Sequence, residues 1–518
     1  MSPSERSGSD IPESDIPESE ILKSETPDRR DQLSIELCVA PENIKALLRF
    51  PGLKRAGRTV SVQTLWYDTP GGDLAQSNRL VAETAGRWRL EQLGPHRERA
   101  WPPLSPAPVW AEGTSLQALA LHGTAPLAPV AALSGRRSRF HLAYDPANDS
   151  AAVAVTLLEG ELRGVAASLG ICRIHLHGPA EALGRVSAAL ARQRLVSVPH
   201  AGLAAEAMAV ARGQAVAARH VGAPEISPGL TLSDTIALIM GQLLDVILHW
   251  SGPAGAGETE VPVHQMRVAT RRLRSALSIF KPVTPCAEIL PLSPALKELA
   301  ARLGAARDWD VFLAGTGASM QAAFPPDRRI KALLAAAGRK REAAYGELRE
   351  YVTSPDFRVL QVALGCAASL RPWEHIGVEE VRQVLHQDAA PFAVGVLTRR
   401  WRQVRRAGRG MSALSVPALH ELRKDCKRLR YAAEFFEPLY PHKTARRFIK
   451  HLAALQEELG MLNDAAAASG LMAHLGRAER SYAAGLVQGF VAAGASHSRS
   501  AIAGRWKSFR QQTPFWLP

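Results

Sequence analysis

One basic segment with helical periodicity occurs twice in this chain, at residues 263–280 and 419–435. Its leading histidine recurs 156 residues later, as His264 and His420, and the basic residues that follow recur at the same offset. A second pair of motifs, LGAARD and LGMLND, is also separated by 156 residues. Two separated motifs that share one offset indicate a duplicated module. The C-terminal part of the chain is therefore expected to fold as two related helical units.

The periodicity of the apolar residues changes along the 518 residues, which are too many for one hydrophobic core. Alternation predicts an antiparallel β domain first, and long amphipathic periods then predict an all-α domain, so the expected fold class is multidomain α+β. The expected boundaries are 1–30 for a disordered acidic tail, 31–212 for the β domain, 213–228 for a linker and 229–512 for the helical domain, with halves at about 229–372 and 373–512.

The net charge of +14 is concentrated in the helical part of the chain. Residues 1–30 carry a net charge of −4, residues 31–228 carry +4 and residues 229–518 carry +14. A localised positive field favours polyanionic partners, which are nucleic acid, an anionic membrane or polyphosphate.

Other features of the sequence limit where the protein works. No stretch of about 18 uncharged apolar residues predicts a membrane span, and the N-terminus lacks the pattern of a signal peptide. The 5 cysteines are far apart and form no CxxC motif, which argues against a zinc site or a disulfide framework. These features predict a protein of the reducing cytoplasm.

The basic residues of each copy form a stripe along one helix. On a helical wheel His264, Arg267, Arg271 and Arg274 fall within about 80° of one another, and their counterparts in the second copy do the same. Predicted N-caps at Thr259 and Ser415 place each histidine near the helix end that favours anions. A bound phosphate would raise the pKa of such a histidine and add a cation to the stripe.

A third stripe repeats this spacing without a histidine, from Arg399 to Arg409. A charged stripe on one helix is most often a solvated face, but three with matched spacing favour a binding site. The predicted polyanion-binding residues are His264, Arg267, Arg271, Arg272, Arg274, Arg399, Arg402, Arg406, Arg409, His420, Arg423, Lys424, Lys427, Arg428, Arg430, Arg446 and Lys450.

Three aspartates follow or lie within the LGAARD and LGMLND motifs, namely Asp308, Asp310 and Asp464. They could be metal ligands, but carboxylates beside basic stripes more often orient arginines through charge-assisted hydrogen bonds. Aromatic residues do not alternate with the basic ones, and no helix-turn-helix pattern appears, which argues against nucleic acid.

The helical part resembles the CHAD family, the conserved-histidine α-helical domains. The resemblance is carried by HxxRVxxRRLRxxxxxF at His264, LGxxRDxDV at Leu303, HxxRKxxKRLRYxxEFF at His420 and LQxxLGxLND at Leu455. It implies two helical units related by a pseudo-twofold axis and a basic groove that binds inorganic polyphosphate without a cofactor.

The β domain resembles the CYTH family of triphosphate tunnel proteins in its WYDTP turn and order of strands. That family closes a β-barrel around a triphosphate and divalent metals held by inward carboxylates. Of its ExExK signature only Glu36 is present, because Ser34 and Cys38 occupy the flanking positions. Other residues that the resemblance carries over more loosely are Arg87, Arg136, Arg137 and Arg139.

We expect a polyphosphate-binding protein that associates with polyphosphate granules and their proteins. The alternative is a CYTH-type triphosphatase tethered by a CHAD domain, with Glu36 as its one identifiable catalytic residue and Mg²⁺ or Mn²⁺ as cofactor. Whether the chain is an enzyme is left open by its sequence, because most of the metal ligands of that family are missing.

Overall fold

The computed structural model describes residues 33–94, 103–106, 109–119, 121, 126–145, 148–215, 224, 226–257, 259–324, 327–475, 482–496 and 498–517. The predicted acidic tail, residues 1–30, lies outside the described residues, as does much of the predicted linker.

The first domain is an antiparallel sheet, as expected. Its strands lie in the order β10-β1-β9-β8-β7-β3-β4-β5-β6, and β2 pairs with β7. Their bounds are β1 Leu33–Val39, β2 Leu53–Arg55, β3 Val60–Asp68, β4 Arg79–Thr84, β5 Arg87–Gln92, β6 Val109–Gly113, β7 Ala128–Asp145, β8 Asn148–Gly164, β9 Ser168–Gly178 and β10 Val196–Ser197. Within the described ranges no pairing joins the two end strands, so closure into a barrel stays a prediction.

The long strands β7 and β8 form the centre of the sheet. Gly135 and Gly160 lie opposite each other in this pair. A Cβ at either position would overlap the backbone of the other strand. The glycines therefore permit a close approach of the two strands that no other residue would allow.

The two faces of the sheet are covered by different helices. Ile35 and Leu37 of β1 join the large core that includes α3 (Ala180–Arg192). The opposite face packs against α4 (Leu203–Arg212), whose Ala207 and Met208 lie in one cluster with Trp66 of β3. Two short helices, α1 (Ile44–Leu48) and α2 (Asp73–Gln76), complete the domain.

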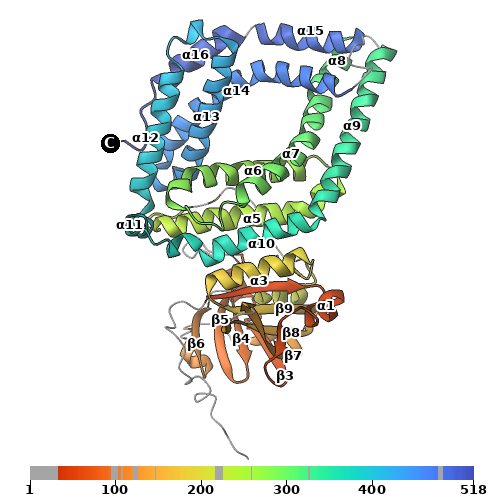
Figure 1. Cartoon of the computed structure of the whole chain (residues 1–518), viewed down its shortest axis with the longest axis vertical. Coiled ribbons are helices and arrows are strands. Elements are labelled where there is room, and N and C mark those ends of the chain that lie inside the picture. The colour runs from red at the N-terminus through yellow and green to blue at the C-terminus, as the bar shows by residue number, and fades with distance from the viewer. Residues whose placement is uncertain are drawn as a thin grey trace, which may run out of the picture.

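The second domain is helical, and Figure 1 shows its helices arranged as a ring above the sheet. The first half contains α5 Leu232–Ala256, α6 Val261–Phe280, α7 Leu292–Val311, α8 Ala318–Ala323, α9 Arg328–Val352 and α10 Pro355–Leu370. The second contains α11 Glu379–His386, α12 Ala389–Ala407, α13 Val416–Phe436, α14 His442–Ala473, α15 Tyr482–Ser496 and α16 Ser498–Arg510.

Helix α5 is the one described helix long and apolar enough to cross a membrane by length and composition. Of its most apolar window, 78% is buried inside the domain, where it packs against α6, α9 and α10. Its apolar residues therefore serve as core.

The duplication is visible in how the halves meet. Phe280 and Phe436, which occupy equivalent positions of α6 and α13, contact each other edge to face at 6.3 Å between ring centroids. Nearby, the N–H of Leu232 donates to Gln387 O at 2.9 Å, and the N–H of Ala389 donates to Leu230 O at 3.2 Å. These are the two hydrogen bonds of an isolated antiparallel bridge between Thr231 and Asp388, which joins the starts of the two halves.

The two domains share a packed boundary. Helix α10 lies against α3, between the sheet and the rest of the ring (Figure 1). Leu104 is fully buried there: its N–H donates to Ser369 Oγ at 3.1 Å, and its carbonyl accepts from the N–H of Glu36 at 2.7 Å. A Cβ at Gly365 of α10 would crowd the Leu104 side chain.

Candidate functional site

The predicted stripes of α6 and α13 face each other in the structure. Burial and the positive charges of Arg423 and Arg271 lower the pKa of Lys427 to about 8, and Arg267 and Arg430 act in the same direction. Burial, with Arg267 and Arg430, also lowers the pKa of Arg271 against an opposing effect of Tyr431. We call Arg267, Arg271, Arg423, Lys427 and Arg430 the α6–α13 cluster.

Few carboxylates neutralise this cluster. Glu434 forms an ion pair with Arg430 at 3.1 Å and accepts a hydrogen bond from Arg272 at 3.2 Å, so it bridges the two helices. Asp308 of α7 lies 3.8 Å from Arg267, and burial raises its pKa while Arg267 opposes the rise. Glu434 therefore orients arginines. Asp308 forms an ion pair with Arg267 that is too long for a hydrogen bond, so the orienting role expected for it stays a prediction. The side chain of Asp464 lies outside the described residues.

Two guanidinium Nε donors of the cluster have neither a hydrogen bond nor an ion pair among the described residues. The Nε atoms of Arg271 and Arg423 are buried and have no hydrogen bond among the described residues. The guanidinium of Arg271 instead lies over the Tyr431 ring, 5.5 Å from its centroid. Buried N–H groups are nearly always satisfied in proteins, so these two are free to donate to a ligand.

The histidines flank the cluster on exposed positions. Burial and the charges of Arg307 and Arg271 lower the pKa of His264, so the free protein carries it neutral near pH 7. Ser415 caps α13 by accepting from the N–H of Ala418, as predicted. The predicted cap at Thr259 is wrong, because α6 begins after Glu260, whose side chain caps nothing and pairs with Arg307 instead.

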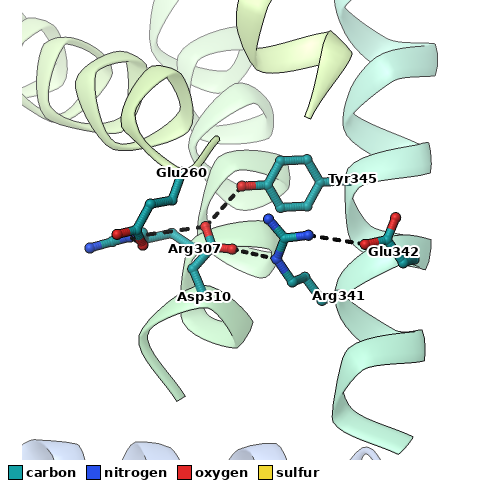
Figure 2. A network of polar contacts seen from close by, with 6 residues as sticks. All are labelled: Glu260, Arg307, Asp310, Arg341, Glu342 and Tyr345. Atoms are coloured by element: carbon teal, nitrogen blue, oxygen red, sulfur yellow. Dashed lines mark hydrogen bonds and ion pairs between the residues drawn. The ribbon is translucent and has the colours of Figure 1, made fainter. Parts of the chain in front are cut away.

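A polar network behind His264 fixes Arg307, a residue that the sequence analysis missed. Figure 2 shows Asp310 between Tyr345 and Arg341, which donate to it at 2.9 and 2.7 Å. Arg307 lies 4.0 Å from the same carboxylate and is bound by Glu260. Asp310 is buried with these cations, so it is a structural acceptor. The sequence signal was the position of Arg307 directly before Asp308 in the LGAARD motif.

Several predicted residues lie apart from the cluster. Lys424 pairs with Glu421 at 2.8 Å and Arg428 pairs with Asp425 at 2.9 Å, and both pairs lie within α13. Arg446 is exposed, 3.7 Å from Glu437. The remaining predicted residues of this kind, Arg274 and Lys450, are exposed.

The third stripe does not join α6 and α13. Arg402, Arg406 and Arg409 line a different pocket, of about 660 Å³, between α12 and α16. It is Arg400 that turns toward α13, where it donates to Arg428 O at 2.5 Å. Burial, Arg399 and Arg428 lower the pKa of Arg400 to about 10. Equal spacing on the sequence therefore did not mean a shared surface.

The carboxylate carried over from the tunnel family is engaged by the protein itself. Arg173 donates to Glu36 at 2.7 Å, to Glu206 of α4 at 2.5 Å and to Ala201 O at 3.1 Å. Nearby Glu91 accepts from Trp66 at 3.1 Å, and burial raises its pKa. Among the described residues no group of three histidine, cysteine or acidic side chains could hold a metal. Arg87, Arg136 and Arg139 are exposed, and Arg137 is half-buried.

Comparisons with known proteins agree with the helical architecture. Residues 238–473 match the model of the CHAD domain. The uncharacterized protein Rv2226 of Mycobacterium tuberculosis H37Rv is 26% identical over 435 residues, covering 77% of this chain and 80% of that protein.

Three solved structures are similar in part. The CHAD domain from the plant Ricinus communis is 30% identical and covers 57% of this chain and 98% of its own, with a TM-score of 0.49. PptA from Streptomyces chartreusis is 16% identical and covers 54% of this chain and 100% of its own, with a TM-score of 0.39. HpAC1 from Hippeastrum, with a dominant triphosphatase activity, is 15% identical and covers 36% of this chain and 97% of its own, with a TM-score of 0.25.

The family match falls on the helices that carry both copies of the histidine and arginine motif, and residues 238–473 of this chain therefore belong to the CHAD domain family.

Proposed function

We propose that the CHAD domain binds inorganic polyphosphate at the α6–α13 cluster. The observation that carries the proposal is a set of cations from two facing helices, among which four arginines and burial lower the pKa of Lys427 while Glu434 links the helices. Like charges at close range repel, and partial burial strengthens that repulsion. Such an arrangement opposes folding unless an external polyanion offsets it, which is the behaviour of a binding site rather than of a solvated surface.

The chemistry of the cluster favours a phosphate chain over nucleic acid. Rows of cations from two helices suit a linear polyanion with about one charge per phosphate, and counterion release then drives affinity. The one aromatic ring within the cluster, Tyr431, is buried and covered by Arg271 and Arg430. It therefore offers no free face on which a base could stack.

The test is a titration of the full chain with long-chain polyphosphate and with duplex DNA at physiological salt. Arg271→Gln/Lys427→Gln should weaken polyphosphate binding by about 2 kcal/mol, roughly 30-fold, and lower the salt dependence by about two counterions. Arg339→Gln/Lys340→Gln, which removes two exposed cations from α9, is the matched control and should leave the affinity within about twofold. DNA binding as tight as polyphosphate binding would reject the proposal.

Triphosphatase activity receives less support from the sheet domain. The Arg173 guanidinium is bound to Glu36, so a divalent cation there would have to displace an ion pair buried under α4. Tripolyphosphate hydrolysis with Mg²⁺ or Mn²⁺ that is abolished by Glu36→Ala would restore this alternative.

A cytoplasmic location on polyphosphate granules, and contact with granule proteins, follows from the same proposal. A fluorescently tagged chain should co-localise with granules, and the Arg271→Gln/Lys427→Gln variant should spread through the cytoplasm.

A further inference from the structure

A second basic pocket lies between α12 and α16 and uses no residue of the α6–α13 cluster. Its volume is about 660 Å³. It is lined by Trp401, Arg402, Arg405, Arg406, Arg409 and Arg510, with Trp506 and two glycines completing the wall. We propose that this pocket binds a compact oligophosphate group of about three phosphates, free or attached to a nucleoside.

The charges of the pocket are uncompensated. No acidic residue lines it, and none of its five arginines forms an ion pair with a carboxylate among the described residues. Elsewhere in this chain, Arg163 and Arg329 pair with Glu161 and Asp327, whereas Arg274 and Arg339 are exposed and form no ion pair among the described residues. The pocket differs from such single cations because five arginines, from α12, the turn after it and α16, line one cavity that no acidic residue lines.

The end of a helix accounts for only part of this charge. Arg405 and Arg406 lie in the last turn of α12, where cations favour the helix dipole. Arg402 lies a turn earlier, Arg409 follows the helix and Arg510 comes from α16, about 100 residues later in the chain. The dipole of α12 therefore does not explain why these three join the other two.

The floor of the pocket is built by close packing. Trp506 of α16 is 5% exposed, and its ring lies where a Cβ at Gly408 would be. Gly410 has a φ of +65°, which turns the chain directly after Arg409. Arg405 covers Trp401 at 5.0 Å from the ring centroid. Aromatic walls keep water from one side of the arginines and so strengthen their attraction for an anion.

The size of the pocket selects the class of ligand. Its volume is typical of a small-molecule site, whereas a long polyphosphate needs an extended surface. Terminal phosphates carry nearly two negative charges each, so a triphosphate group roughly balances the five cations. Guanidinium forks bind such oxygens in pairs.

The experiment uses the full chain with Arg271→Gln/Lys427→Gln, so that the cluster of the proposed function contributes little. Isothermal titration with tripolyphosphate, ATP and adenosine should show one site per chain for the first two, with a Kd of roughly 10 µM, and none for adenosine. Adding Arg406→Gln/Arg409→Gln should weaken binding of both ligands at least tenfold. Adding Arg339→Gln/Lys340→Gln instead should change it less than about twofold.

The outcomes separate the sources of the phosphate group. Similar affinity for tripolyphosphate and ATP identifies the phosphates as the recognised group, and ATP binding more than tenfold tighter adds recognition of the base by Trp401. Unchanged tripolyphosphate binding after Arg406→Gln/Arg409→Gln, no binding at all, or adenosine binding as tight as ATP would overturn the proposal. Gly408→Ala, which displaces Trp506 and keeps every arginine, should weaken binding as well. Failure of long-chain polyphosphate to bind the parent chain leaves this result intact.

Discussion

A buried cation of the sheet domain, Arg173, and a half-buried cation of the helical ring, Lys427, have opposite surroundings. In the sheet domain Arg173 is 1% exposed and lies between two carboxylates, Glu36 and Glu206, with a backbone carbonyl as third acceptor. In the ring, four arginines lower the pKa of Lys427, and the buried Nε atoms of Arg271 and Arg423 have no hydrogen bond among the described residues.

Under the proposed function, this difference separates a structural cation from one that binds a ligand. A guanidinium that neutralises internal carboxylates completes the core and leaves nothing for a ligand. Cations that raise one another's energy gain most from an anion supplied from outside. The carboxylate carried over from the tunnel family, Glu36, is therefore already neutralised by Arg173, whereas the α6–α13 cluster has few internal counterions.

The largest expected effect is a loss of stability when the buried ion pairs of Arg173 are removed. Arg173→Met leaves Glu36 and Glu206 buried without a counterion, and should destabilise the sheet domain by about 3–5 kcal/mol. Urea unfolding measures this loss. The control Arg163→Met removes an exposed pair with Glu161 and should leave the urea midpoint nearly unchanged. Equal losses for the two variants would show that the buried triad is not essential to the domain.

The next effect is the pH dependence of polyphosphate affinity, which Lys427 should control. Because the pKa of Lys427 is about 8 in the free protein, Lys427 is mostly charged at pH 7 and mostly neutral at pH 9.5. A bound polyanion raises that pKa, so binding above pH 8 takes up a proton and affinity should fall about tenfold between pH 7 and 9.5. Lys427→Arg keeps the charge and should flatten the profile. A parent profile as flat as that of the variant would separate Lys427 from the ligand.

A smaller effect should appear in stability without ligand. The folded pKa of Lys427 lies below the unfolded value of 10.5, so its charge opposes folding fully below pH 8 and not at all above 10.5. Lys427→Met should therefore raise Tm by about 2–4 °C at pH 7, with the gain fading as pH rises toward 10.5. Calorimetry without phosphate in the buffer checks this, and a lower Tm at pH 7 would contradict it.

The smallest effect belongs to the histidines. The pKa of His264 is lowered by burial and by its arginine neighbours, so at pH 7.5 His264→Ala/His420→Ala should change polyphosphate affinity by less than about twofold. Binding raises this pKa, so the parent should gain about threefold on going to pH 5.5, and the double variant should not. An unchanged gain in the variant would make the histidines structural.

Much of the fold was predictable because its signals are local. The duplication, the antiparallel sheet before a helical domain and the Ser415 cap follow from spacing and residue type along the chain. The roles of particular cations were less predictable. The stripe on α12 repeats the spacing of the stripes on α6 and α13, yet three of its four arginines, Arg402, Arg406 and Arg409, line the pocket beside α16.

The sequence by itself determined that a basic helix is duplicated, which residues share one of its faces, and that this part of the chain is a CHAD domain. The tertiary structure decided which faces meet. In the folded chain Arg271 lies over Tyr431, Glu434 contacts arginines of both α6 and α13, and Glu36 pairs with Arg173. The physical reason is range: helical periodicity depends on residues within two turns, whereas charge pairing depends on side chains brought together from more than 100 positions apart.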